Sequence, residues 1–82
     1  MRAIKKVRRL IESEPTSPAA VELSKLIVSL ESGETFSFKQ MYELPLNDFD
    51  LAVELIKEWR LDRFYEGKIK ALNAAIQVQK ND

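Results

Sequence analysis

Apolar residues recur every three to four positions along most of the chain, which is the spacing of one face of an α-helix. The spacing is interrupted at prolines, at glycine and at residues that commonly cap helices, so the pattern divides into separate segments. It predicts helices over 2–13, 18–32, 38–44, 48–60 and 61–78. We therefore expect an all-α fold, a small bundle of four to five helices, forming one domain over 1–82 with about 79–82 frayed.

Local signals mark the boundaries of the first two predicted helices. Pro15 ends the first helix, because the residue before a proline is disfavoured in the α conformation. Ser17 followed by Pro18 is the order expected for an N-cap and a first helical residue. Gly33 then provides a left-handed stop for the second helix.

Two further helix starts carry capping signals. Ser37 and Gln40 fit a capping box, and Asn47 is a second candidate N-cap, with Pro45 separating the two helices. Apolar residues on either side of each cap form predicted staple pairs, Phe36 with Met41 and Leu46 with Leu51.

The apolar stripes predict which side chains form the core. The segment 18–32 is apolar on two sides, so we expect it to be the most buried helix. The predicted core consists of Ile4, Val7, Leu23, Leu26, Ile27, Leu30, Phe36, Met41, Leu46, Phe49, Val53, Ile56 and Trp59.

A second apolar stripe follows Trp59 and does not continue the stripe of the preceding helix. One straight helix over 48–78 would be apolar nearly all round, which a chain of 82 residues could hardly cover. Either the helix bends near Arg60–Asp62 or Gly67, or the stripe meets another chain; a β-hairpin at Tyr65–Lys68 is a further alternative. The stripe, a candidate interface, contains Leu61, Tyr65, Ile69, Leu72 and Ile76.

The composition excludes several kinds of chemistry. The chain has no cysteine and no histidine, which removes thiol nucleophiles, disulfides and the usual zinc ligands and general base. Asp48, Asp50 and Glu54 stand where helix capping and the helix dipole already account for acids. We expect no catalytic residue, no metal ligand and no cofactor, and therefore no enzyme. No apolar run is long enough for a membrane span, and we expect a cytoplasmic protein.

The charges are unevenly distributed although the net charge is zero. Residues 1–11 carry five cations and no acid, whereas residues 12–58 carry a net charge of −7. These cations either bind an external anionic partner or complement the protein's own acids between Glu43 and Glu58. A membrane surface is disfavoured, because the apolar side of this helix lacks Trp and Phe. The candidate patch for an anionic partner contains Arg2, Lys5, Lys6, Arg8 and Arg9.

The order of a medium helix, a short capped helix and a longer helix over about residues 19–60 resembles the trihelical core of helix-turn-helix and winged-helix domains. The resemblance implies that the helix from residue 48 would enter the DNA major groove. Its early residues are Asp48, Asp50 and Glu54, and carboxylates are repelled by phosphates. We therefore expect such a core to serve protein contacts rather than groove reading.

Together these features predict a non-enzymatic protein–protein interaction module, an adaptor or regulator of the kind encoded in bacterial or phage genomes. Its expected partner is another protein or a second copy in a homodimer, with no small-molecule substrate. The alternative is a nucleic-acid-binding regulator that uses the basic N-terminal helix.

Overall fold

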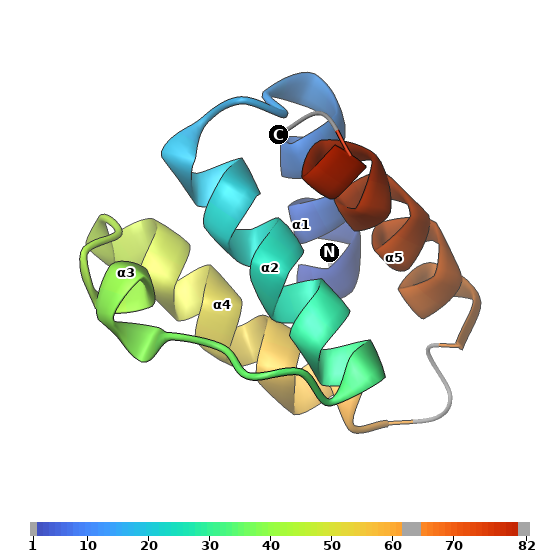
Figure 1. The fold of residues 1–82 in the computed structure, drawn as a ribbon. Helices are drawn as coiled ribbons and strands as arrows, with labels where there is room; N and C mark the ends of the chain where they lie inside the picture. The colour runs from blue at the N-terminus through green and yellow to red at the C-terminus, as the bar shows by residue number, and fades with distance from the viewer. Residues whose placement is uncertain (1, 62–64, 81–82) are drawn as a thin grey trace.

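The computed structural model describes residues 2–61 and 65–80, and these form five helices (Figure 1). Their bounds are α1 Ala3–Ser13, α2 Pro18–Ser32, α3 Phe38–Tyr42, α4 Leu46–Trp59 and α5 Tyr65–Lys80. No strand occurs in this part of the chain, so the predicted all-α class and small bundle are confirmed. None of the described helices combines the length and apolarity needed to cross a bilayer.

Helices α1, α2 and α5 form the main packing unit, and α4 covers α1 and α2 from the other side (Figure 1). The α2–α5 interface is the most extensive, followed by α1–α5. The end of α4 meets the start of α1, where Glu58 contacts Ala3. The short α3 packs on α4, on the side of α2 away from α5 in Figure 1.

The boundaries of α2 follow the predicted local signals. The Ser17 Oγ accepts a hydrogen bond from the Ala20 N–H at 3.1 Å, and Pro18 is the first helical residue. Gly33 ends the helix in the left-handed conformation, with φ of 78°. Such a φ favours glycine, which has no Cβ to clash with the backbone.

The predicted caps of α3 and α4 are wrong in detail. Ser37 occupies the N-cap of α3, but its side chain makes no capping hydrogen bond. Helix α4 begins at Leu46, so Asn47 lies inside the first turn and does not cap the helix. The cap is Pro45, whose extended backbone directs its carbonyl at the N–H groups of Asp48 and Phe49, both at 2.9 Å.

The predicted core is largely confirmed, with one clear error. Of the predicted residues, seven are buried: Ile4, Val7, Leu23, Leu26, Ile27, Met41 and Trp59. Five are partly buried: Leu30, Phe36, Phe49, Val53 and Ile56. Leu46 was expected in the core but is 72% exposed, because α4 turns Ala52, Leu55 and Trp59 inward instead. Helix α2 has more buried residues than any other described helix, as predicted.

Helix α5 is separate from α4 and begins at Tyr65, so the β-hairpin alternative is wrong. Its buried face consists of Ala71, Ala75 and Val78 rather than the larger residues of the predicted stripe. Small side chains allow α5 to approach two helices at once. Gly67 also lies near α1, where an added Cβ would stand 3.4 Å from the Ile4 Cγ2 in ordinary contact. The predicted bend at Arg60–Asp62 lies partly outside the described residues. Fraying was predicted for about 79–82, but Gln79 and Lys80 belong to α5, and 81–82 lie outside the described residues.

Candidate functional site

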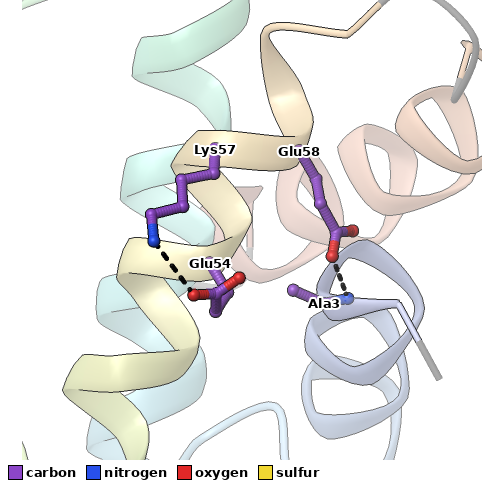
Figure 2. Close-up of polar contacts among 4 residues, drawn as sticks. All are labelled: Ala3, Glu54, Lys57 and Glu58. Atoms are coloured by element: carbon purple, nitrogen blue, oxygen red, sulfur yellow. Dashed lines mark hydrogen bonds and ion pairs between the residues drawn. The ribbon is translucent and has the colours of Figure 1, made fainter.

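The basic helix α1 is anchored by a carboxylate from the C-terminal end of α4 (Figure 2). The two oxygens of Glu58 accept hydrogen bonds from the Ala3 N–H at 2.7 Å and the Ile4 N–H at 3.0 Å. These are among the first amides of α1, which have no partner within the helix. The negative charge also opposes the unfavourable effect of the nearby cations on the positive end of the helix dipole. The sequence pattern did not reveal this role of Glu58.

The five cations of the candidate patch do not form one surface. Arg8 is partly buried, whereas Arg2, Lys5, Lys6 and Arg9 are exposed. Lys6 lines a groove toward α4 that also contains Asp50, Glu54 and Glu58. In this groove Lys6 lies near the protein's own acids. This is the arrangement described by the interpretation in which the cations complement acids of the same chain.

Three other cations line a second groove, between α1 and α5, which we call the basic groove. It has a volume of about 240 Å³ and receives Lys70 from α5 in addition to residues of α1. Its lining consists of Arg2, Ile4, Lys5, Arg8, Glu66, Gly67 and Lys70. The structure therefore adds Lys70 to the predicted patch and separates Lys6 from it.

The predicted apolar stripe of α5 is only partly available on the surface. Tyr65 is 69% exposed and Ile69 is 41% exposed. Leu61, Leu72 and Ile76 are partly buried. The exposed part of this candidate interface is thus confined to the first two turns of α5.

A larger apolar surface lies on α3 and α4, and we call it the aromatic ladder. Four rings follow one another: Phe36 and Phe38 are 5.5 Å apart between centroids, Phe38 and Tyr42 are 6.3 Å apart, and Tyr42 and Phe49 are 5.8 Å apart. The two middle rings are 50% and 69% exposed. Leu46, one turn before Phe49 on α4, extends the surface.

The sequence did contain a signal for the ladder. Phe38 and Tyr42 are four residues apart and share one helix face, while Met41 is the buried residue of α3. A helix of five residues presents little more than one face to the core. Two aromatic side chains away from that face must remain at the surface.

The described residues contain no group of three or more acids, cysteines or histidines placed to hold a metal ion. Glu54 is paired with Lys57 on the same helix at 3.3 Å (Figure 2). No protein-family model, curated protein or solved structure matches the chain. The physical features of its surfaces therefore carry the functional argument.

Proposed function

We propose that this protein is a non-enzymatic interaction module, an adaptor or regulator in the bacterial or phage cytoplasm, and that it contacts a partner protein through the aromatic ladder. The observation that supports this is the exposure of Phe38, Tyr42 and Leu46 in a chain whose other large apolar residues are mostly buried or partly buried. Aromatic residues, tyrosine above all, are enriched at the centres of protein interfaces.

The size of the ladder is appropriate to the centre of an interface. Its three exposed side chains present roughly 400 Å² of apolar surface, taking about 200 Å² for a complete large side chain. A standard interface buries about 800 Å² on each partner, so a polar rim of similar area would complete the contact. An exposed apolar patch of this size on a small protein commonly marks an interaction site.

The charges around the ladder favour a different protein over a second copy. Within residues 36–50, the segment that carries the rings, the acids Glu43, Asp48 and Asp50 outnumber the one cation, Lys39. Two copies that met ladder to ladder would bring these acids together, and like charges in an interface are unfavourable. The partner we propose presents an apolar side chain flanked by lysine or arginine.

The experiment is a comparison of two tyrosines that have the same exposure. Tyr42 in the ladder and Tyr65 on α5 are each 69% exposed. A tagged copy in the native host is expected to co-purify one partner, which is lost on Tyr42→Ser and retained on Tyr65→Ser. Binding of the purified partner should become weaker as the salt concentration rises, because the proposed lysine or arginine residues of the partner would contact the acids of residues 36–50.

Equal recovery of the partner with both variants would contradict the role of the ladder. A purified partner whose contact segment is acidic would contradict the proposed charge match. Both tyrosine variants should unfold at nearly the same denaturant concentration as the unmodified protein, since neither side chain is in the core.

Self-association is a second candidate, supported by the exposure of Tyr65 and Ile69 on α5. A homodimer through this stripe should dissociate on Ile69→Glu, which places charge in the contact. Light scattering after size exclusion measures the mass, and a monomer at high protein concentration would contradict it.

Nucleic-acid binding is disfavoured by the position of the acids, because the groove beside Lys6 also contains Asp50, Glu54 and Glu58. A shift in gel mobility at low salt that disappears on replacing Lys6 and Arg9 would favour it over the present proposal.

A further inference from the structure

We propose that the seam between α1 and α5 binds an amphiphilic anion, that is, one phosphate or carboxylate group carried on an apolar chain. The anionic group would lie in the basic groove. The apolar chain would extend along the same seam toward the C-terminal ends of both helices.

The first observation is a buried donor without an acceptor. The Arg8 Nε is shielded from solvent and has no hydrogen-bond partner. A buried N–H of a charged guanidinium is costly when it is unpaired, and native proteins usually provide a partner for such a group. An oxyanion in the basic groove would accept this hydrogen bond and neutralise part of the charge.

The second observation is the charge around Arg8. Lys5 on α1 and Lys70 on α5 line the same groove, so two helices contribute cations. The acid of this groove, Glu66, is already paired with Lys70, whose Nζ lies 3.4 Å from its Oε1. A bound anion would therefore meet a site that is positive on balance.

The third observation is an adjoining, larger groove that shares Arg8 and Lys70 with the first. It has a volume of about 640 Å³. Besides the two shared cations, its lining combines four apolar residues with three polar ones: Ile11, Pro15, Ala74 and Val78 with Glu12, Asn73 and Gln77. Small-molecule sites commonly have volumes of about 300–1,000 Å³ and combine apolar walls with a few polar groups. The two grooves together provide a basic end for the anionic group and a partly apolar end for its chain.

Acids at both ends of the seam favour a single anionic group over a polyanion. Glu66 lies at the start of the basic groove, and Glu12 lines the far part of the larger groove. A nucleic-acid strand needs a row of cations for successive phosphates, and these carboxylates interrupt such a row.

The test is a titration of the ¹⁵N-labelled full chain that follows the arginine Nε–H signals by NMR. The probes are inorganic phosphate, hexyl phosphate, octyl phosphate and octanoate, each below its micelle concentration. We expect a saturable shift of the Arg8 signal and roughly threefold tighter binding for each methylene that becomes buried. Comparison of octyl phosphate with octanoate distinguishes the two anionic groups, and vesicles doped with phosphatidic acid distinguish a lipid headgroup from a free amphiphile.

Matched variants assign the effect to the seam. Arg8→Lys keeps the charge but removes the Nε donor, and it should weaken binding about tenfold or more. Arg9→Lys changes the next residue of α1, which is not among those lining the groove, and should leave binding unchanged. Ala74→Glu should remove the dependence on chain length. Denaturant unfolding checks that each variant remains folded.

An Arg8 signal that does not move with any probe would overturn the proposal. Equal affinities for inorganic phosphate and octyl phosphate would overturn it as well, because the apolar groove would then contribute nothing. So would an Arg8→Lys variant that stays folded and binds octyl phosphate as tightly as the unmodified protein.

Discussion

Glu58 links two helices that are distant in sequence. Its carboxylate completes the hydrogen bonding of the first turn of α1, at a separation of 55 residues from Ala3. An N-terminal turn that carries Arg2, Lys5 and Lys6 would otherwise combine unpaired amides with cations at the positive end of the dipole. One side chain therefore stabilises a local charge arrangement that is unfavourable by itself.

We expect Glu58→Ala to lower the free energy of unfolding by about 1–2 kcal/mol, because two amide hydrogen bonds and the charge are lost. Glu58→Gln keeps an acceptor oxygen and should lose less. Urea unfolding followed by circular dichroism measures both variants. The control is Glu54→Gln, one turn earlier, whose exposed pair with Lys57 should contribute no more than about 0.5 kcal/mol. Equal effects at the two positions would contradict the anchoring role.

The two glycines of the chain should respond in opposite directions to alanine. Gly33→Ala places a Cβ at φ of 78° and should destabilise the protein by about 1 kcal/mol. Gly67 is helical, and its added Cβ would make an ordinary contact with Ile4, so Gly67→Ala should stabilise by about 0.5–1 kcal/mol. Thermal unfolding of both variants measures the difference, and destabilisation by Gly67→Ala would indicate that α1 and α5 pack more tightly than described.

At the scale of elements, the predicted boundaries are most accurate where a short-range signal acts alone. Ser17, Pro18 and Gly33 fix α2 because capping and glycine stereochemistry depend on neighbours a few residues away. At α4 the same reasoning failed, since Asn47 was the predicted N-cap whereas Pro45, two residues earlier, occupies that position. The presence of a side chain able to cap a helix therefore does not determine the residue at which the helix begins.

The face that a helix turns inward was harder to predict than its existence. The predicted core included Phe49, Val53 and Ile56 of α4, which are partly buried, whereas the fully buried positions of this helix are Ala52 and Leu55. In α5 the large residues were again expected to be the contact residues, whereas alanines form the buried face. Close packing between helices selects small side chains, and a count of apolar residues cannot detect that selection.

Because α4 buries Leu55 and exposes Leu46, we expect opposite results from truncating these two leucines. Leu55→Ala should cost about 3 kcal/mol of unfolding free energy, because a fully buried side chain leaves a cavity. Leu46→Ala should change stability by less than about 0.5 kcal/mol, since that side chain is 72% exposed. Denaturant unfolding of the two variants measures their free energies of unfolding. A larger loss for Leu46→Ala than for Leu55→Ala would contradict the described orientation of α4.

At the scale of the whole molecule, the functional surfaces were only partly predictable. The basic patch was recognisable from composition, because five cations without an acid are visible in the sequence. Its division between an acidic groove and the α1–α5 seam depends on where α4 and α5 pack, which no local signal specifies. The ladder likewise depends on α3 lying at the edge of the bundle (Figure 1).

Helix α5 covers both α1 and α2, so we expect the fold to depend on it. A chain ending before residue 65 would expose the apolar faces of α1 and α2 to water. Such a chain should show reduced helicity and no cooperative thermal transition by circular dichroism. The full chain under the same conditions is the control, and a cooperative transition in the shortened chain would contradict this dependence.

The anchoring of α1 by Glu58 also has a consequence for biosynthesis. The ribosome makes Ala3 first, and the carboxylate that it contacts is added 55 residues later. At about 5–20 residues per second, that interval lasts roughly three to eleven seconds. The helix covering α1 on its other side is translated later still. The nascent chain therefore carries a basic, uncapped α1 segment that can dock fully only after α4 and α5 have been synthesised.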